Sequence, residues 1–436
     1  MKRTLVWCTF LLLFSRPSSA QTLRIFQIDV ESADAALIVT PNGKTLLIDS
    51  GKNGMGPRIK KVMDDAGVSK IDVFVNSHYH EDHFGGIKSL ADLGVSVLES
   101  FDRGNKARCF SAAEMMTGRF GDYMTTVGED ARPLRAGDTI TLDPLVTITV
   151  IASSGGVIGA SAPLTTCDEN DLSVSLLLTF AGFKAFFGGD THKPTEAKIA
   201  ARDLVMNVDL FKANHHGSHT SSLATFMTDL LPSVVVISNG SHLTFKHPRQ
   251  DTLNTYRSLS PAPAIFQTNK CLHPLPCDNE PVASIADPES VDEDGTIVIT
   301  VNAATSTYTV AFGTTTRPFA IKSPAAPVAP SGGVVISSLL PNPAGDDARL
   351  EAVMLQNKGS AAVSLIGWIL RDRSGATWNL SGSLASGTSR TFVRLGQAMT
   401  LNNAGDEIAL IDAATLERDR FEYAASSEGV TINTSH

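Results

Sequence analysis

The stretch His78-Tyr79-His80-Glu81-Asp82-His83 places three imidazoles beside two carboxylates within one short loop. It directly follows the apolar run Ile71-Asp72-Val73-Phe74-Val75, which has the composition of a buried strand. Neutral imidazole and carboxylate are the usual ligands of zinc and its neighbours in the first transition row. A solvated polar loop is the plainer interpretation. The chain has only eleven histidines in 436 residues, however, so three of them in one loop favour a metal site.

Two further loops with ligand chemistry also follow apolar strands. Gly188-Gly189-Asp190 comes after the run 183–187, and Asn214-His215-His216-Gly217-Ser218 comes after the run 208–212. Strand ends in an open α/β sheet meet at one edge, where such folds bind their ligands. Each loop alone is a weak signal. Their order, each behind a strand, predicts that all three converge on one site.

Short strands and helices alternate up to about residue 312, which predicts a layered α/β domain that we place at residues 21–316. We expect residues 102–137, which are polar, to form an insertion over the site. Predicted helices begin near Pro57, Ile87, Glu196 and Leu223. The predicted strands are 23–30, 35–40, 44–48, 71–76, 95–98, 145–151, 172–180, 183–187, 208–212, 234–237, 296–301 and 307–312.

The first twenty residues have the composition of a secretory signal peptide. Lys2 and Arg3 precede the apolar run 5–14, and Pro17-Ser18-Ser19-Ala20 supplies small residues for a cleavage site. The run is too short to span a bilayer as a helix, and no later segment is long enough. The sequence therefore predicts an exported protein, secreted or periplasmic, with no transmembrane segment in the mature chain.

Charge and cysteine content bear on partners and location. Without the three positive charges of the signal peptide, 33 basic residues stand against 45 acidic ones. Such a chain binds nucleic acid poorly by charge alone, although local basic patches could still exist. Four cysteines remain, and an even number in an exported chain predicts disulfides. Three connectivities are possible, and we expect the pairs Cys271–Cys277, across a short loop, and Cys109–Cys167.

The composition changes after residue 316. Residues 317–332 are rich in Pro, Ala, Ser and Gly, which is typical of a semi-rigid linker. Residues 333–425 show short alternating strands, many turn residues and no convincing helix, which predicts an all-β sandwich, and 426–436 form a tail. We expect Trp368 and Trp378 in the core of this sandwich, because strand aromatics usually pack inward.

The ligand loops resemble the metallo-β-lactamase superfamily, whose His-x-His-x-Asp-His pattern matches residues 78–83. Within it, residues 23–312 are similar to the hydrolase domains of ComEC-type DNA-uptake competence proteins. The resemblance implies an αββα sandwich with two divalent metal ions at one edge, zinc or alternatively manganese. The supporting matches are Asp29-Val30 with Asp34-Ala35, Leu47-Ile48-Asp49-Ser50-Gly51, Asn170-Asp171-Leu172-Ser173, Gly189-Asp190, His215-His216-Gly217-Ser218 and His247-Pro248.

Carried over residue by residue, the resemblance implies six metal ligands. Two cations about 3.5–4 Å apart lower the pKa of a shared water and stabilise charge on the attacked phosphoryl or acyl group. Asp82 and Asp190 would act in catalysis through these ions. The first metal would be held by His78 and His80, and the second by Asp82, His83 and His216, with Asp190 bridging the two.

Four other residues are assigned near the site. Asp49 is expected to orient a ligand histidine rather than bind metal itself. His247 would donate a hydrogen bond or proton to the leaving oxygen, unless it is a surface histidine before a helix. His215 competes with His216, which we favour as the ligand because adjacent residues rarely share one metal. Ser218 either caps a helix or contacts substrate.

Two features depart from the superfamily pattern. No histidine occurs from 84 to 189, where another ligand is common, although the ComEC-type branch resembles this chain in that respect. The first metal would then be labile, or completed by water and substrate, with Asn170 or Asp171 near the vacancy. The glycine-rich turn of the family reads Asp29-Val30-Glu31-Ser32-Ala33-Asp34 here, which affects the local turn more than the chemistry. We expect solvated loop positions for His192, His219, His242 and His273.

The end of the chain resembles the lamin tail domain, an immunoglobulin-like β-sandwich, over about residues 332–425. Such a domain implies attachment to an envelope or extracellular partner rather than catalysis. The matching stretches are Leu340-Pro341-Asn342-Pro343-Ala344-Gly345-Asp346-Asp347, Leu355-Gln356-Asn357-Lys358-Gly359, Gly367-Trp368 and Leu401-Asn402-Asn403-Ala404-Gly405-Asp406-Glu407-Ile408.

The sequence thus favours an exported dinuclear metal hydrolase that cleaves phosphodiesters, in nucleic acid or in an envelope component. The bond preference follows from the ComEC-type resemblance, since the ligands would serve esters, lactones or β-lactams equally. A lactonase or β-lactamase-type hydrolase is the alternative enzyme. A surface recognition protein with a structural or vestigial metal site is the alternative from another class, and the complete set of ligands argues against it.

Overall fold

The computed structural model describes residues 22–159, 166–242, 244–273, 275, 277–289, 295–322, 333–345, 347–359, 362–394, 396–413 and 417–434. The predicted signal peptide lies outside these residues, as do positions 323–332 of the predicted linker. No helix in the described part of the chain is long and apolar enough to cross a membrane.

The first sheet of the large domain contains both ends of that domain. Its strand order is β18-β17-β16-β1-β2-β3-β4-β5-β6, and the strands from β3 to β6 run parallel. Because β16 to β18 come last, the chain returns to the sheet in which it began. The bounds are β1 (Thr22–Gln27), β2 (Ala36–Val39), β3 (Thr45–Ile48), β4 (Lys70–Val75), β5 (Ser96–Asp102), β6 (Arg132–Pro133), β16 (Ile297–Asn302), β17 (Thr307–Phe312) and β18 (Thr315–Ala320).

The second sheet consists of the middle of the chain, in the order β15-β14-β13-β12-β11-β10-β8-β7, with β9 paired to β8. Strands β11 to β15 are parallel, so the loops that follow them leave from the same edge. The bounds are β7 (Thr139–Asp143), β8 (Val146–Ser153), β9 (Gly156–Val157), β10 (Ser175–Phe180), β11 (Phe183–Phe187), β12 (Leu210–Lys212), β13 (Val234–Ile237), β14 (Ala264–Asn269) and β15 (Ile285–Asp287).

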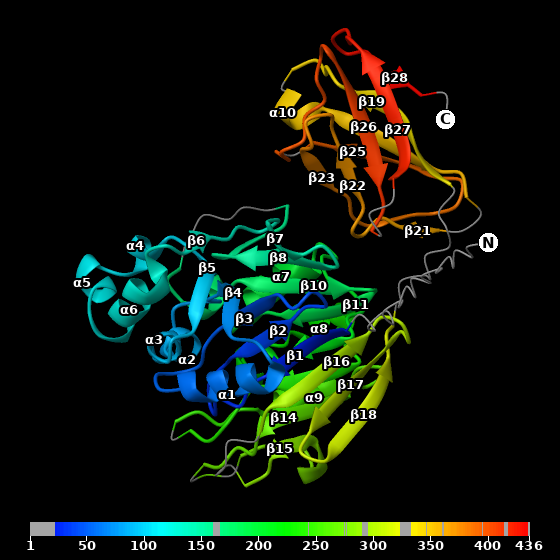
Figure 1. Cartoon of the computed structure of the whole chain (residues 1–436). Helices are drawn as coiled ribbons and strands as arrows, with labels where there is room; N and C mark the ends of the chain where they lie inside the picture. The colour runs from blue at the N-terminus through cyan, green and yellow to red at the C-terminus, as the bar shows by residue number, and fades with distance from the viewer. Residues whose placement is uncertain are drawn as a thin grey trace, which may run out of the picture.

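Helices cover the outer faces of the two sheets (Figure 1). Helix α1 (Gly56–Ala66) starts with a proline and ends at Gly67 with φ 73°, as its sequence signals predict. Helices α1, α2 (Glu81–Phe84) and α3 (Ile87–Asp92) lie on the first sheet. The second sheet is covered by α7 (Lys193–Ala200), α8 (Ala224–Leu230) and α9 (Gln250–Arg257).

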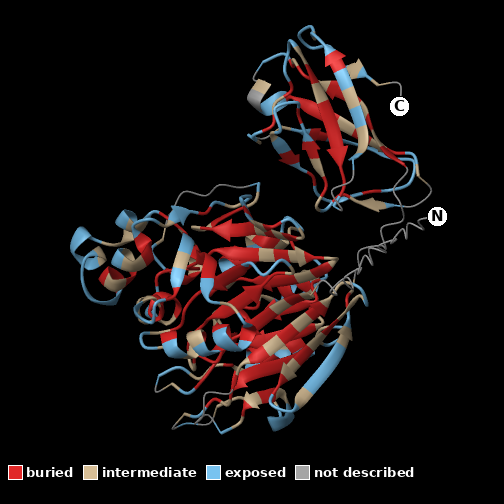
Figure 2. Ribbon diagram, viewed as in Figure 1, coloured by how far each residue is buried: buried red, intermediate tan, exposed pale blue. Residues whose placement is uncertain are grey.

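Three apolar clusters account for this layering. One fills the space between the sheets, with Ile25, Val75 and Phe183 among its buried members. The other two lie beneath the helices, around Ile59 on one side and around Phe226 on the other. Figure 2 shows the same concentration of buried residues in the strands. The predicted αββα sandwich is confirmed.

Residues 102–137 form three short helices, α4 (Lys106–Cys109), α5 (Ala112–Met115) and α6 (Gly118–Tyr123), followed by the π-helical turn Met124–Gly128. Aromatic side chains of this insertion surround Tyr79, with ring-centroid distances of 5.8 Å to Phe110 and 5.2 Å to Phe120. The insertion therefore packs on the residue between two predicted ligands.

Both expected disulfides form, with Cα–Cα distances of 5.5 Å for Cys109–Cys167 and 5.9 Å for Cys271–Cys277. The first joins the insertion to the segment just before the 3-10 turn Asn170–Leu172. Strand β18 continues the first sheet four residues past the predicted domain boundary at 316.

The C-terminal part is all β apart from the single turn of α10 (Asp347–Leu350) within the described residues. Trp368 and Trp378 are 3% and 2% exposed, which confirms their core positions. Four-stranded sheets β25-β20-β19-β28 and β23-β22-β26-β27, with the pair β21-β24, make up this domain. The bounds are β19 (Val334–Leu340), β20 (Ala352–Asn357), β21 (Val363–Ser364), β22 (Ile369–Arg371), β23 (Thr377–Asn379), β24 (Ser383–Leu384), β25 (Ser389–Val393), β26 (Gly405–Ile411), β27 (Glu417–Ala424) and β28 (Ile432–Asn433).

Candidate metal centre

The predicted ligand loops come from both sheets and meet at one edge. The histidine loop follows β4 in the first sheet, and the loops with Asp190 and His216 follow β11 and β12 in the second. One ligand atom from each of His78, His83 and Asp190 lies within 4.8 Å of the others, and the same holds for Asp82, His83 and His216. Because His83 belongs to both groups, the two form one continuous cluster.

Distances within the cluster place the imidazoles around Asp190. Its Oδ2 atom is 3.2 Å from His83 Nε2 and 3.5 Å from His216 Nε2. His216 Nε2 is also 3.5 Å from Asp82 Oδ2. His78 Nε2 is 3.0 Å from Nδ1 of His80. The structure thus brings all six predicted ligands to one place.

Several atoms of this cluster are buried without a hydrogen-bond partner in the described residues. They are Nε2 of His83, Nε2 of His216 and Oδ1 of Asp190. Buried polar atoms are normally satisfied, so several buried nitrogen and oxygen atoms without a partner in one cluster are those expected of metal ligands. The residues present therefore fit the divalent cations that the sequence implies.

The charges of the cluster also fit a metal site. Burial alone would raise the pKa of Asp190, but the charges of His83 and His216 hold that pKa well below its ordinary value. Burial alone would lower the pKa of His83, yet Asp190 and Asp49 raise it well above the ordinary value. Metal binding at His83 would compete with protonation of this imidazole, because a ligand nitrogen must be free of its proton.

Asp49 lies where a residue that orients a ligand should lie. Its Oδ2 is 2.8 Å from His83 Nδ1, and it accepts hydrogen bonds from the backbone N–H and the hydroxyl of Ser77 at 2.7 and 2.8 Å. These contacts leave Nε2 of His83 free to face Asp190. A carboxylate behind a histidine in this way fixes its ring and tautomer.

The adjacent pair His215 and His216 has two different environments. Nδ1 of His216 is 2.9 Å from the carbonyl of Ser238, so its Nε2 is directed at the carboxylates. Nδ1 of His215 is 2.8 Å from Thr220 Oγ1, and its Nε2 is 3.8 Å from Asp190 Oδ2. The geometry favours His216 as the ligand. Both residues have positive φ, 49° and 53°, an unusual conformation for non-glycine residues that clusters at functional sites.

The Gly-Gly-Asp sequence has a steric reason. A Cβ atom on Gly188 would lie 2.2 Å from Oδ1 of Asn214, and Gly189 has φ 56°. Asn214 in turn donates through its side-chain amide to Glu196 Oε1 at 2.8 Å. The two loops of the second sheet are thus packed directly against each other.

His247 lies beside the cluster. Its ring centroid is 5.4 Å from that of His215 and 6.4 Å from that of His216. Burial and the charge of His216 lower the pKa of His247 to about 3. The imidazole is therefore neutral near neutral pH, so it can donate a hydrogen bond to a leaving oxygen but carries no spare proton.

Two other residues assigned near the site, Ser218 and Asn170, are both buried. Ser218 is buried, and its Oγ accepts a hydrogen bond from the Thr220 hydroxyl at 3.1 Å. It does not cap α8, which begins at Ala224, and it does not face solvent. Asn170 is 8% exposed, and its Oδ1 has no hydrogen-bond partner among the described residues.

The expectation that His192 is a solvated loop residue is wrong. Its side chain is 14% exposed, and its Nε2 lies 3.1 Å from Nδ1 of His215. Its other nitrogen is 3.6 Å from Asp168 Oδ2, and the three residues His192, Asp168 and Asp171 offer ligand atoms within 4.8 Å of one another. The turn after Asp190 therefore contacts the His215 loop, and no local sequence pattern predicts this contact.

The residues that support the histidine loop from behind could not be recognised from the sequence. Arg103 is 1% exposed, forms a buried ion pair with Glu169, and its guanidinium carbon lies 4.4 Å from the Tyr79 ring centroid. Glu169 Oε2 also accepts the backbone N–H of Tyr79 at 3.0 Å. Glu196 supports the other loop, since it accepts the backbone N–H groups of Ser222 and Leu223 at 2.9 and 2.6 Å.

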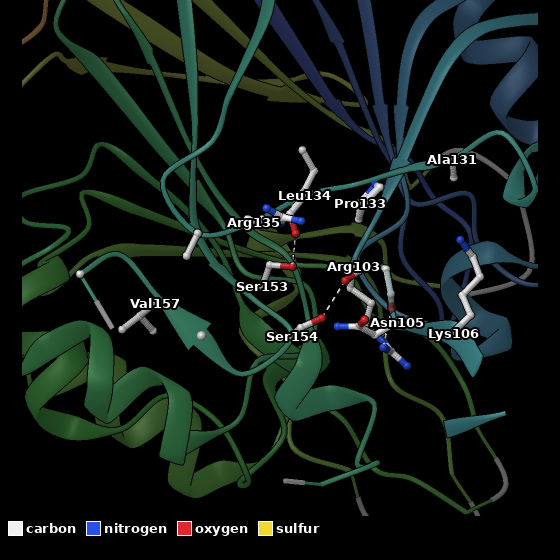
Figure 3. Close-up of a pocket in the computed structure, with 14 residues that line it drawn as sticks. Arg103, Asn105, Lys106, Ala131, Pro133, Leu134, Arg135, Ser153, Ser154 and Val157 are labelled. Carbon is white, nitrogen blue, oxygen red and sulfur yellow. Dashed lines mark hydrogen bonds between the residues drawn. The ribbon is translucent and has the colours of Figure 1, made fainter. Parts of the chain in front are cut away.

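A cavity of about 770 Å³ lies next to the insertion (Figure 3). Arg103, Lys106 and Arg135 line it, and none of the predicted ligands does. In Figure 3 the side chains of Arg135 and Lys106 lie on opposite sides of Arg103. Arg103 connects this cavity to the histidine loop through Tyr79.

Comparisons with known proteins agree with this geometry. Residues 28–238 match the Metallo-beta-lactamase superfamily, and residues 327–425 match the Lamin Tail Domain. ComE operon protein 3 of Bacillus subtilis is 21% identical over 266 residues, which are 57% of this chain and 32% of that protein. The chain thus spans about a third of the length of this relative.

Solved structures with low sequence identity are also similar. A diphosphatase of the PhnP family has 14% identity and a TM-score of 0.35, covering 56% of this chain and 94% of its own. CmlA, a diiron beta-hydroxylase from Streptomyces venezuelae, has 12% identity and a TM-score of 0.34, covering 59% and 54%. A metallo-beta-lactamase from Cronobacter sakazakii has 21% identity and a TM-score of 0.28, covering 42% and 71%.

Each family match covers part of one of the two units of the fold. The first match contains the histidine loop, Asp190 and His216, and the second contains both core tryptophans. Residues 28–238 form a metallo-beta-lactamase superfamily domain, and residues 327–425 form a lamin tail domain.

Proposed function

We propose that the predicted hydrolase domain, residues 21–316 with β18 added to it, is an exported dinuclear phosphodiesterase or nuclease. The observation that carries the proposal is the cluster itself. His83 from one sheet and His216 from the other both direct Nε2 at Oδ2 of Asp190, at 3.2 and 3.5 Å. The preference for phosphodiesters rests on the resemblance to ComEC-type competence proteins.

The proposed ligand assignment is the one that the family resemblance implies. His78 and His80 would hold the first metal, zinc or manganese, Asp82, His83 and His216 would hold the second, and Asp190 would contribute to both. Two bound divalent ions would supply hydroxide near neutral pH and stabilise charge on the attacked phosphoryl group.

The chain's own groups then have defined tasks. Asp49 and the Ser238 carbonyl fix the rings of His83 and His216, so that both Nε2 atoms remain directed at the cluster. His247, neutral at the operating pH, donates a hydrogen bond to the leaving oxygen. The buried Arg103–Glu169 pair holds Tyr79, and with it the backbone between His78 and His80.

Location and partners are part of the proposal. The two disulfides support an oxidising compartment, and hence secretion or a periplasmic location. We assign what remains of the predicted linker after β18, up to residue 332, as the connection between the domains, 333–425 as the unit that recognises an envelope or extracellular partner, and 426–436 as a tail.

The test is a metal-dependent activity screen on the full chain. Metal content is measured, and hydrolysis of bis(p-nitrophenyl) phosphate, a chromogenic lactone and a chromogenic β-lactam is followed with and without chelator. We expect two metal ions per chain and chelator-sensitive turnover of the diester. His216→Gln should lower this turnover at least about 100-fold, while His219→Gln, at an exposed position, should leave it unchanged.

Each other outcome supports a different function. Turnover of the lactone or the β-lactam alone would replace the phosphodiesterase by the alternative hydrolase. A protein loaded with metal but inactive on all three substrates would favour the non-catalytic recognition protein.

A further inference from the structure

A row of aromatic rings leads from the metal centre to the surface. The ring of His247 is inclined by 22° to that of His216, at a centroid distance of 6.4 Å. Phe245 is stacked on His247, with an interplanar angle of 4° and a centroid distance of 5.8 Å. His242 follows at 4.8 Å from Phe245. The last large apolar ring of this row, Phe245, is 55% exposed.

The segment that carries this row is anchored to the ligand loop. The backbone N–H of Arg249 donates to the carbonyl of Gly217 at 2.9 Å, directly after His216. The side-chain amide of Asn239 donates to the His247 carbonyl at 3.3 Å. Phe245 is therefore held in a defined position relative to the metal centre while more than half of its surface is exposed.

Further apolar surface lies on the neighbouring loop. Leu272 and Leu275, within the loop closed by the Cys271–Cys277 disulfide, are 44% and 59% exposed. The backbone N–H of Leu272 donates to the Ser241 hydroxyl at 3.2 Å, which joins the two loops. A single exposed apolar residue is ordinary, whereas these two loops, joined by that hydrogen bond, expose three.

Two cations accompany the exposed ring. Lys246 and Arg249 lie on either side of His247 in the sequence, and neither forms an ion pair within the part of the chain that the structure describes. The whole chain carries a formal charge of −9, so a local pair of unpaired cations is a departure from its average. Aromatic rings interleaved with cations are the combination that binds single-stranded nucleic acid, by base stacking and phosphate neutralisation.

We propose that Phe245, with Lys246 and Arg249, forms a subsite for an unpaired base and its adjacent phosphate in a single-stranded nucleic acid whose scissile phosphodiester lies at the metal centre. This proposal rests on the proposed function and names its substrate class. A stacked ring accepts the face of any base, so the subsite selects single strands over duplexes without selecting a sequence. The cations explain how an acidic protein holds a polyanion.

The test separates stacking from charge in a binding assay without turnover. Full-length protein carrying Asp190→Asn is titrated against fluorescein-labelled (dT)10, a chain of the same length built of abasic sites, and a blunt duplex. Phe245→Ala should raise the Kd for (dT)10 by about 5- to 150-fold, the equivalent of about 1–3 kcal/mol, and leave the abasic chain unaffected. Phe245→Trp should restore binding of (dT)10.

The charge part of the proposal has its own readout and controls. Lys246→Gln and Arg249→Gln should weaken the (dT)10 and abasic complexes alike, and each should reduce the slope of log K against log salt by about 0.7. Leu98→Ala, which removes a 56% exposed side chain from β5, should change neither Kd.

Several results would overturn the subsite: no binding of (dT)10, an equal Kd for Phe245→Ala and its parent, an equal loss on the abasic chain, or equally tight binding of the duplex. The failures of the two proposals are distinguishable. Phe245-dependent binding of (dT)10 by a protein that cleaves no diester would refute the proposed function alone. Chelator-sensitive diester cleavage with no effect of Phe245→Ala on binding would refute the subsite alone.

Discussion

Replacing Glu169 by glutamine should destabilise the hydrolase domain strongly, although the residue is not a metal ligand. The side chain of its partner Arg103 has no exposed surface, and that of Glu169 is 6% exposed. Glutamine keeps the shape and one oxygen that can still accept the Tyr79 N–H, but it removes the charge and replaces the other acceptor of Arg103 by an NH2 group. Removing one partner leaves an uncompensated buried charge, which costs about 3–5 kcal/mol.

The matched control is Glu99→Gln, because Glu99 is 54% exposed and pairs with Arg132, which is 62% exposed. A surface pair of this kind contributes about 0–1 kcal/mol. Urea unfolding followed by far-UV circular dichroism measures both variants. After residue 20 the only tryptophans in the sequence are Trp368 and Trp378, so tryptophan fluorescence reports the lamin tail domain and should show the same midpoint throughout.

A loss below about 1 kcal/mol for Glu169→Gln, equal to that of the control, would refute the view that this pair supports the histidine loop. The double replacement Arg103→Met with Glu169→Leu provides a second check. It removes both charges and keeps apolar bulk, so it should recover much of the lost stability.

The other predictions concern the ligand supports and the insertion. Asp49→Asn should lower metal affinity about 10- to 100-fold, because His83 loses its orienting carboxylate. Competition with a chromogenic chelator measures the affinity, and the far-UV spectrum should stay the same. Unchanged affinity would contradict this role of Asp49. In metal-free protein the pKa of His247 is about 3 when folded and about 6.5 when unfolded, so only the unfolded chain takes up this proton as the pH falls. Lowering the pH from 6.5 to 5 should therefore cost about 2 kcal/mol of stability from this group, and His247→Asn should lower the pH slope of the unfolding free energy by one proton; an identical slope would exclude the effect. Replacing Cys109 and Cys167 together by serine should cost about 2–4 kcal/mol and speed deuterium uptake in the insertion, and equal uptake in both proteins would show that the insertion is held by packing alone.

The ligand loops were predictable because the evidence for each lies within a few consecutive residues of the sequence. Rare residue types stand directly behind apolar strands, and the strand run before the histidine loop begins within one residue of β4 as observed. The supports were not predictable in this way. Glu169 lies 66 residues from Arg103 in the sequence and 90 from Tyr79, so nothing near Glu169 marks it as a partner of the loop.

The predicted domain boundary at residue 316 failed for a different reason, because it cuts through strand β18. Its residues 317 and 318 are Arg and Pro, which resemble the start of the linker. Proline is tolerated at the edge of a sheet, and β18 is an edge strand whose pairing with β17 decides its structure. Helix α9 was missed because polar residues dominate its surface, and only Leu253, Tyr256 and Thr252 are buried in it.

The position of the ligands has a consequence for the order of assembly. His83 belongs to a loop of the first sheet and Asp190 to a loop of the second, and the first sheet is complete only when β16 to β18 have returned to it. While the two sheets remain apart, the first carries His78, His80, Asp82 and His83 and the second carries Asp190 and His216, so neither holds the full ligand set. Only the associated sheets complete the cluster, and ions bound there would cross-link the seam between them.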